Sequence, residues 1–186
     1  MQSVIRVRNL YKLYHLGEET VRALDGVDFE IQKGEFCAIV GTSGSGKSTL
    51  LNMLAGLEKP TKGEVVISGC HLERMNEEQL VSFRRRRVGF IFQAYQLIAS
   101  MDAEENVALP LSFRGMKKSE RTLRARRMLD RVMLGKYRKH FPNQMSGGQQ
   151  QRVGVARALV SDPEIIFADE PTGNLDSRTS REIMSL

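Results

Sequence analysis

Three short apolar runs divide the chain, and polar or glycine-rich residues follow each of them. The runs lie at residues 36–40, 88–92 and 165–168 and are rich in β-branched and aromatic side chains. Because continuous apolar runs of this length are typical of strands buried on both faces, they predict a mostly parallel sheet. Residues 4–7 and 27–31 instead alternate apolar and polar side chains, as half-buried antiparallel strands do. The pattern predicts the α/β class with an N-terminal antiparallel β subdomain.

Helical periodicity follows the first apolar run and precedes the second. Leucines recur at helical spacing from position 50 to 57, and Gly56 is expected to end this helix. Asn76 and Gln79 have the spacing of a capping box, which predicts a second helix through roughly Arg86. The residues of this helix that we expect to face inward are Leu80, Val81 and Phe83.

From about residue 95 to 144 the pattern changes from strand to helix, with abundant arginine and lysine. Ser119 is expected to cap a helix that ends at Gly135. The apolar positions with helical spacing in this helix are Ala125, Met128, Leu129, Val132 and Met133. We therefore expect residues 95–144 to form an inserted α-helical subdomain, in which the methionines fill irregular gaps.

Composition adds few constraints on function. The 186 residues suit a single domain, residues 1–186, and 28 Lys and Arg against 22 Asp and Glu give a net charge of +6. This charge is compatible with an anionic ligand or a lipid-proximal surface, but it is too small to indicate nucleic-acid binding. Residues 84–87 are four arginines without interleaved aromatics, which favours a solvated helix end over an anion or nucleic-acid patch.

The cysteines and the N-terminus bear on the compartment. Cys37 and Cys70 have no metal-ligand or CxxC spacing, which predicts free thiols in a reducing environment. The first residues carry no apolar signal region, and no apolar run approaches the roughly 18 residues that a membrane-spanning helix needs. We therefore expect a soluble or peripheral protein.

The glycine-rich stretch after the first apolar run fits a phosphate-binding loop of the form GxxxxGK[ST]. Its residues are Gly41, Thr42, Ser43, Gly44, Ser45, Gly46, Lys47, Ser48 and Thr49. Successive backbone amides in such a loop wrap polyphosphate, and glycines permit the close approach. Lys47 is expected to contact the β- and γ-phosphates, and the Ser48 hydroxyl is expected to be a ligand of Mg²⁺. With a strand before it and a helix after it, this loop predicts a P-loop NTPase core.

Polar residues also end the other two apolar runs. Gln93 follows the second run, at a position where ligands bind in α/β folds, although a loop-capping glutamine is the alternative interpretation. Asp169 and Glu170 follow the third run. Asp169 is expected to hold Mg²⁺ through its water shell, and Glu170 to orient and deprotonate water. These carboxylates predict metal-assisted hydrolysis.

Two further signals are weaker. Residues 146–149, Ser-Gly-Gly-Gln, open a helix with an N-terminus that can hold an anion. Tyr14 can stack on a nucleobase through its ring face, but an ordinary strand tyrosine is an equally good interpretation.

The order of these motifs resembles the ATP-binding cassette family. The phosphate loop, Gln93, the SGGQQQR sequence at 146–152, the IIFADE sequence at 165–170 and the GNLD sequence at 173–176 occur in register over essentially the whole chain. The resemblance implies an ATPase that uses ATP and Mg²⁺.

Particular residue roles follow from the resemblance alone. It implies that Tyr14 stacks on adenine and that Gln93 is the lid glutamine and a metal ligand. It also implies that Glu170 is the catalytic base, and that Lys47 and Gln93 are further catalytic residues. It also implies a head-to-tail dimer or paired cassette that encloses two ATP molecules. There Ser146, Gly147 and Gly148, with Gln149 beside them, would contact the γ-phosphate held by the other protomer. Asp176 would lie in the loop that crosses to that protomer.

Within the family, three segments most resemble the group that serves lipoprotein release, macrolide export and cell division, and they are residues 17–27, 89–93 and 168–177. This resemblance implies an integral membrane permease as partner, no nucleic acid, and a peripheral place on the cytoplasmic face of the cell membrane.

The chain departs from the family pattern at two places. Met145 stands where leucine is usual, a nearly volume-conserving exchange that should cost little. The chain ends at Leu186, about ten residues past Asp176, whereas family members continue into another strand and a switch histidine. The histidines at 15, 71 and 140 do not lie at that position. We therefore expect either a fragment or a degenerate cassette, in which residues 1–186 alone bind ATP but hydrolyse it poorly.

The leading functional hypothesis is a subunit that couples ATP binding and hydrolysis to motion of a permease. A non-transport regulatory cassette that signals through a membrane partner is the alternative, and the sequence does not separate the two. A nucleic-acid maintenance ATPase is disfavoured, because the chain has one phosphate loop and no sustained heptads.

Overall fold

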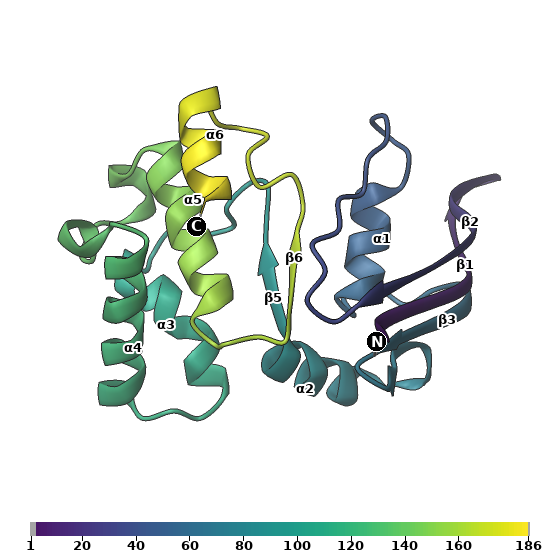
Figure 1. The fold of residues 1–186 in the computed structure, drawn as a ribbon, viewed down its shortest axis with the longest axis horizontal. Coiled ribbons are helices and arrows are strands. Elements are labelled where there is room, and N and C mark those ends of the chain that lie inside the picture. The colour runs from purple at the N-terminus through teal and green to yellow at the C-terminus, as the bar shows by residue number, and fades with distance from the viewer. Residues whose placement is uncertain (1–2, 186) are drawn as a thin grey trace. The chain divides into compact units, whose positions relative to one another are not determined.

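The computed structural model describes residues 3–185 and divides the chain into two compact units (Figure 1). The first unit comprises residues 1–83 and the second comprises residues 84–186. The boundary falls within helix α2 (Glu77–Arg87). Among the residues described, no helix has the length and apolar character needed to cross a membrane.

An antiparallel sheet dominates the first unit, with the strand order β2-β1-β3-β4. Its strands are β1 (Ser3–Leu16), β2 (Glu19–Gln32), β3 (Lys62–Ile67) and β4 (Cys70–His71). Val7 on β1 is paired with Phe29 on one side and Val65 on the other. The two alternating segments predicted as antiparallel strands are confirmed, and both strands extend well beyond the predicted bounds. Helix α1 (Lys47–Leu54) packs on this sheet and buries Leu50, Met53 and Leu54.

The predicted buried strand at residues 36–40 is wrong for this structure. This segment is irregular, and Phe36 and Val40 are 86% and 92% exposed. Over residues 3–185, no strand is paired with it, and the two parallel strands of the chain belong to the second unit. An apolar run forms a strand only when neighbouring strands make hydrogen bonds with its backbone groups. Residues 36–40 have no such neighbour among the described residues, so this segment is irregular.

The capping box predicted for α2 is confirmed. The Gln79 amide donates to Asn76 Oδ1 at 2.9 Å, and the Asn76 amide donates to Gln79 Oε1 at 2.9 Å. Leu80 is buried as expected, whereas Val81 is exposed. Adjacent helical positions point about 100° apart, so one narrow apolar face does not accommodate both. The four arginines at 84–87 form the last turn of α2, in agreement with the helix-end interpretation.

In the second unit, β5 (Val88–Ile91) and β6 (Ile165–Ala168) form a parallel pair. Their register runs from Val88 beside Ile165 to Ile91 beside Ala168. Both predicted strands are therefore confirmed, although Ile166 is exposed and only Phe167 of β6 is buried. Because the strands are parallel, their carboxyl ends meet at one edge.

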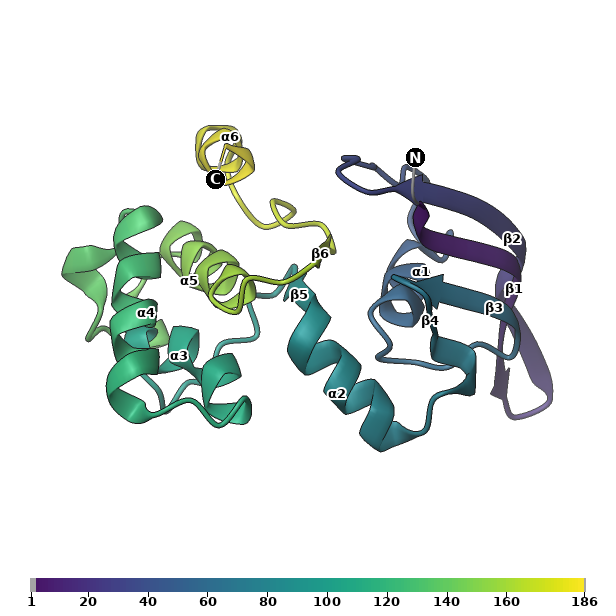
Figure 2. The same cartoon turned by 60° about the horizontal axis from the view of Figure 1, so that its bottom comes forward.

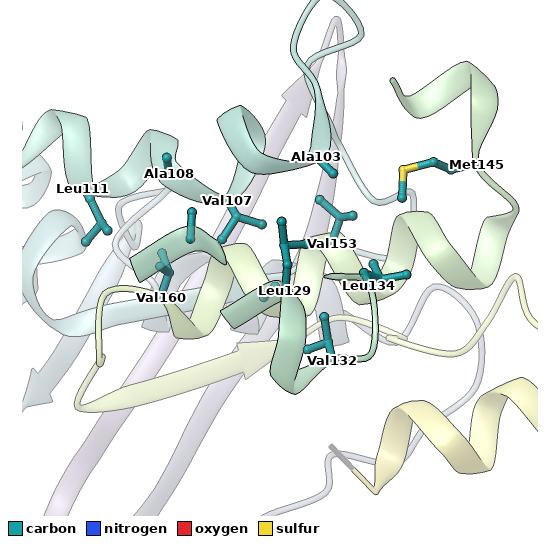
Figure 3. Close-up of a cluster of buried hydrophobic side chains, with 12 residues drawn as sticks. Ala103, Val107, Ala108, Leu111, Leu129, Val132, Leu134, Met145, Val153 and Val160 are labelled. Carbon is teal, nitrogen blue, oxygen red and sulfur yellow. The ribbon is translucent and has the colours of Figure 1, made fainter. Parts of the chain in front are cut away.

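Three helices form the core of the second unit, and both ribbon views show them grouped together (Figures 1 and 2). They are α3 (Ala103–Phe113), α4 (Lys118–Arg131) and α5 (Gly147–Leu159), with short 3₁₀ turns at Gly135–Tyr137 and Pro142–Gln144. Twelve buried side chains make up the cluster in Figure 3: Ala103, Val107, Ala108, Leu111, Ala125, Leu129, Val132, Leu134, Met145, Val153, Ala156 and Val160. Met145 packs in this cluster, as a leucine would.

The predicted bounds of α4 need correction. The residue before its first turn is Lys117, which makes no side-chain cap, and Ser119 lies inside the helix. The helix ends at Arg131 rather than at Gly135, because the chain turns at Met133, whose φ is +61°. Met128 packs against the cluster as expected, but Met133 is exposed. The unit closes with α6 (Ser177–Met184). Cys37 and Cys70 are free thiols, as predicted.

Candidate nucleotide site

The predicted phosphate loop keeps a specific local geometry in the first unit. Lys47 Nζ donates to the carbonyl oxygens of Gly41 and Thr42, at 3.0 and 2.8 Å. Gly46 precedes α1 with a φ of +86°, and a Cβ there would collide with the Ala23 carbonyl oxygen. Glycine is therefore required at position 46, and the loop holds the Lys47 ammonium group at the start of α1.

The chemistry of this loop fits a triphosphate. The first amides of a helix lack intrahelical acceptors, so the start of α1 offers donors next to a cation. Gly44 has a φ of +79°, and a side chain there would meet nothing within 4 Å, so the backbone is open on that side. The loop from Gly41 to Ser45 is exposed, which leaves it accessible to an anionic ligand.

The oxygen donors predicted for Mg²⁺ are the Ser48 hydroxyl in the first unit, and the Gln93 amide oxygen and the Asp169 carboxylate in the second. Among residues 3–185, no group of three or more His, Cys, Asp or Glu side chains is arranged to hold a metal. Mg²⁺ keeps several waters and takes few protein ligands beside substrate phosphates.

Tyr14 lies on β1 and is fixed by its neighbours. Its hydroxyl donates to Glu58 Oε2 at 2.6 Å, and Lys12 Nζ lies 5.0 Å from the ring centroid. Burial and the bond to Glu58 raise the pKa of Tyr14. Burial alone would raise the pKa of Glu58, but hydrogen bonds from Tyr14, Asn52 and Lys12 bring it below its usual value. The hydroxyl of Tyr14 is engaged within the protein, so a nucleobase would use the ring face.

Gln93 and Glu170 meet in the second unit, although 77 positions separate them. Gln93 Nε2 donates to Glu170 Oε2 at 2.8 Å. The parallel ladder explains this contact, because Ile91 and Ala168 are paired and the Asp169 amide extends the ladder to the Ile91 carbonyl at 3.0 Å. Each side chain lies two residues past its strand. The structure therefore brings together a predicted lid glutamine and a predicted general base.

The loop after β6 lies beside this pair, whose two residues are exposed. Glu170 has a φ of +40°, and the Gly173 amide donates to its carbonyl oxygen at 2.9 Å. A Cβ at Gly173 would lie 3.0 Å from Gln93 Nε2 and 3.2 Å from Glu170 Oε2, so a side chain there would crowd the pair. Asn174 Nδ2 donates to the Gln93 carbonyl at 3.1 Å. A left-handed non-glycine residue held by its surroundings is common at functional sites.

Gln151 supports the same loop from α5 and was not predicted from the sequence. Its side chain is fully buried, and its Nε2 donates to the Pro171 carbonyl at 2.6 Å, while its Oε1 has no partner among the described residues. The available signal was periodicity: Gln151 lies four residues before Val155, on the face of α5 that is buried. A polar residue at a core position of a helix needs a specific partner.

The SGGQ motif forms the start of α5. Ser146 Oγ accepts from the Gln149 amide at 3.3 Å, and Gln149 Oε1 accepts from the Ser146 amide at 2.9 Å, which is a capping box. A Cβ at Gly147 would lie 2.8 Å from the Tyr95 hydroxyl, and one at Gly148 would lie 2.6 Å from the Thr179 methyl. Both glycines therefore permit close packing around this helix end.

Asp176 caps α6. Its Oδ1 accepts from the amides of Arg178 and Thr179, both at 3.0 Å, and its Oδ2 accepts from the Thr179 hydroxyl at 2.6 Å. These bonds, that of the Thr179 hydroxyl first, lower the pKa of Asp176. The local role of Asp176 is thus to begin the helix that follows the predicted crossing loop.

Comparison with known proteins identifies a family. Residues 24–173 match the family described as ABC transporter. The chain is 45% identical over 183 residues to the lipoprotein-releasing system ATP-binding protein LolD of Chromohalobacter salexigens, covering 98% of this chain and 77% of LolD. It is 49% identical over 183 residues to the macrolide export ATP-binding/permease protein MacB of Hyphomonas neptunium, covering 98% of this chain and 28% of MacB.

A solved structure is also similar. The ATP-binding cassette MJ0796 of Methanocaldococcus jannaschii, as a post-hydrolysis dimer bound to ADP and Pi, superimposes with a TM-score of 0.91 at 46% identity. The match covers 97% of this chain and 80% of that chain.

Proposed function

The chain belongs to the ABC transporter family, as an ATP-binding cassette with ATPase activity, and from this premise we propose that it drives a membrane permease of the lipoprotein-release or macrolide-export kind. The name of the MacB relative supports the pairing, since it joins ATP-binding and permease functions in one protein. The proposal places the cassette as a peripheral subunit on the cytoplasmic face of the membrane, with residues 95–144 as its helical subdomain.

In this proposal the phosphate loop from Gly41 to Thr49 binds the triphosphate. Lys47 supplies a charge-assisted contact to the phosphates, a type of contact that contributes about 1.5–3 kcal/mol. Tyr14 stacks on the adenine. The Lys47 geometry supports this role, because its ammonium group already binds the carbonyl oxygens of Gly41 and Thr42 in the loop that the phosphates would enter.

The residues proposed to hold Mg²⁺ are Ser48, Gln93 and Asp169, all of them oxygen donors. When bound, Mg²⁺ supplies positive charge that neutralises the β- and γ-phosphates. Asp169 acts from the end of β6, where its backbone amide is fixed by the Ile91 carbonyl.

The hydrogen bond between Gln93 and Glu170 is the observation that carries the proposed chemistry. Glu170 accepts the proton of the attacking water, while the amide of Gln93 holds the Glu170 carboxylate in one orientation. A positioned general base contributes about 10²–10⁴-fold to the rate. The left-handed backbone at Glu170 supports the role, because the loop fixes where this carboxylate points.

We further propose that two cassettes form a head-to-tail dimer. Ser146, Gly147 and Gly148, with Gln149, then contact the γ-phosphate bound by the partner, and Asp176 lies in the crossing loop. The dimer of the MJ0796 relative supports this arrangement. The start of α5 suits an anion, because its first amides point along the helix axis out of the N-terminus.

Glu170→Gln tests the chemistry. The variant should bind ATP as tightly as the native chain, hydrolyse it about 10²–10⁴-fold more slowly, and accumulate as a dimer with Mg-ATP. Steady-state phosphate release and analytical ultracentrifugation measure these effects. Glu164→Gln is the matched control, since Glu164 lies just before β6 and pairs with Arg87 at 3.3 Å. Normal turnover by a monomeric Glu170→Gln variant would remove Glu170 from the role.

The permease is tested separately. Purification of the cassette from its own membranes in mild detergent should recover a membrane protein in stoichiometric amount whose removal changes the ATPase rate. A rate that is indifferent to that protein would contradict the coupling.

A further inference from the structure

The segment that follows Gln93 has a strained backbone. Tyr95 and Gln96 are consecutive non-glycine residues with φ of +59° and +48°. Side chains disfavour this left-handed region, so two in a row persist only where the surroundings hold them. A hydrogen bond from the Gln96 amide to the Ala94 carbonyl at 2.5 Å closes a tight turn within the segment. The conformation after Gln93 therefore depends on contacts from other elements.

Arg157 of α5 provides such contacts with one guanidinium group. Its two terminal nitrogens donate to the carbonyl oxygens of Gln96 and Tyr95, at 2.6 and 2.8 Å. Burial lowers the pKa of the Arg157 guanidinium, whose described partners are these two carbonyl oxygens. The planar guanidinium group can bind two carbonyl oxygens at the same time. Arg157 therefore fixes the backbone geometry of Tyr95 and Gln96.

Tyr95 extends along α5 from this point. Its carbonyl lies 3.8 Å from the place a Cβ would take at Gly154, and its hydroxyl lies 2.8 Å from the corresponding place at Gly147. Figure 1 shows α5 beside β5, the strand that leads into Gln93. The segment is thus held against the same helix that begins with the SGGQ motif.

The far end of the segment is fixed independently. The buried Asn106 of α3 accepts from the Ile98 amide at 2.8 Å, and its Nδ2 donates to the Ile98 and Met101 carbonyls at 3.1 and 3.0 Å. With Asn106 at one end and Arg157 near the other, little freedom remains for the residues between.

We propose that Arg157 is a positioning residue for Gln93, and through Gln93 for Glu170. Only Ala94 lies between Gln93 and Tyr95, the first residue whose carbonyl Arg157 binds. Release of that carbonyl therefore frees the backbone next to the residue that bonds to Glu170. The inference rests on the proposed roles of Gln93 and Glu170. It adds that Arg157 connects α5, which begins with the SGGQ motif, to the Gln93 side of the pair, as Gln151 connects it to the Glu170 side.

Arg157→Lys tests the proposal, because lysine keeps the charge but loses the planar fork. We expect kcat to fall about tenfold with the ATP dissociation constant unchanged, since small displacements of a catalytic group cost rate. The matched control is Arg114→Lys. Arg114 also donates to backbone carbonyls, those of Arg85, Arg86 and Ser161 at 2.7, 3.0 and 2.7 Å, and burial lowers its pKa as well. Its contacts lie at helix ends away from Gln93.

A double variant separates positioning from general damage. If Arg157 acts through Gln93, the Gln93→Ala variant should lose rate, and adding Arg157→Lys should cause no further loss. Multiplied losses, or equal losses of kcat in Arg157→Lys and Arg114→Lys, would overturn the inference. Normal turnover by Gln93→Ala would instead refute the proposed role of Gln93 itself.

A second variant covers the case in which Arg157→Lys does not fold. Tyr95→Gly adopts a positive φ without strain and loosens the segment by removing the ring that lies beside Gly147, while it keeps Arg157. The same fall in kcat, absent in the Gln93→Ala background, is expected. Unchanged kcat in Tyr95→Gly would overturn the inference.

Discussion

The phosphate loop and the Gln93–Glu170 pair both follow apolar runs in the sequence, but they are built in different ways. The contacts described for the loop come from neighbours along the chain and from the adjacent strand β2: Lys47 binds carbonyls five and six residues before it, and Gly46 lies against Ala23. The Gln93–Glu170 bond joins residues 77 positions apart and depends on the β5–β6 ladder and on α5.

The consequence is visible at residues 36–40. The strand expected there is not formed, yet the loop after it retains its left-handed glycines and its Lys47 contacts. The Gln93–Glu170 pair has no such independence, because its two residues meet only when the two parallel strands are in register. We therefore expect substitutions in the loop to act on nucleotide affinity and substitutions around the pair to act on turnover.

After Glu170→Gln, the largest effect is expected for Lys47→Ala. Loss of a charge-assisted phosphate contact of about 1.5–3 kcal/mol should weaken ATP binding by roughly 10–150-fold. Titration of a fluorescent ATP analogue measures it, with Lys33→Ala as control, since Lys33 is exposed in the turn after β2. Unchanged affinity and unchanged hydrolysis in Lys47→Ala would contradict the assignment of the loop.

Gln151→Leu should lower turnover without weakening ATP binding, in contrast to Lys47→Ala. The substitution releases the Pro171 carbonyl next to Glu170 but also removes the unpartnered Oε1, so the unfolding free energy should change by no more than about 1 kcal/mol. We expect kcat to fall about tenfold with unchanged ATP affinity. Urea denaturation and steady-state kinetics test this; a loss of rate that merely tracks a loss of stability would argue against positioning.

Ser146→Ala and Ser119→Ala compare a serine that caps a helix with one that does not. Ser146 accepts from the Gln149 amide, so its removal should cost about 1 kcal/mol of stability. Ser119 lies within α4, and its replacement should change stability by less than about 0.5 kcal/mol. Equal losses in thermal or urea unfolding would mean that the start of α5 is not stabilised by its cap.

The smallest effect is a pH dependence at Glu104. Burial would raise the pKa of Glu104, but bonds from Arg126 at 2.7 Å and Lys139 at 3.1 Å bring it below its ordinary value of 4.5. A lowered carboxyl pKa contributes stability above the ordinary value, and this contribution is lost as the pH falls through the folded pKa. Arg126 and Lys139 are 46% and 67% exposed, which limits the contribution to less than about 1 kcal/mol.

Glu104→Gln measures that contribution. At neutral pH the variant should unfold slightly more easily than the native chain, and the difference should shrink as the pH falls below 4.5. Urea denaturation over a pH series gives both curves. If the difference in unfolding free energy grew as the pH fell, the pKa of Glu104 would not be lowered in the folded state.

Several local features could be predicted because short-range chemistry fixes them. The capping box at Asn76 depends on residues three positions apart, and it formed as expected. The box at Ser146 has the same spacing, but the sequence interpretation was only that residues 146–149 open a helix. The cap at Ser119 was wrong because a serine followed by helical periodicity does not say which turn of the helix comes first. The inward orientation expected for Val81 was wrong for a similar reason, since helical periodicity predicts which face is buried but not how wide that face is.

By itself, the sequence determined the phosphate loop, the β5 and β6 segments, the helix starts with capping boxes and the candidate residues Gln93 and Glu170. Only the tertiary structure decided that Gln93 and Glu170 are bonded, and that Arg157 and Gln151 hold the backbone beside them. The physical reason is how far apart along the chain the interacting residues lie. Glycine conformations, caps and helical faces arise from residues a few positions apart, whereas the pair and its supports require strand register and helix packing over tens of residues.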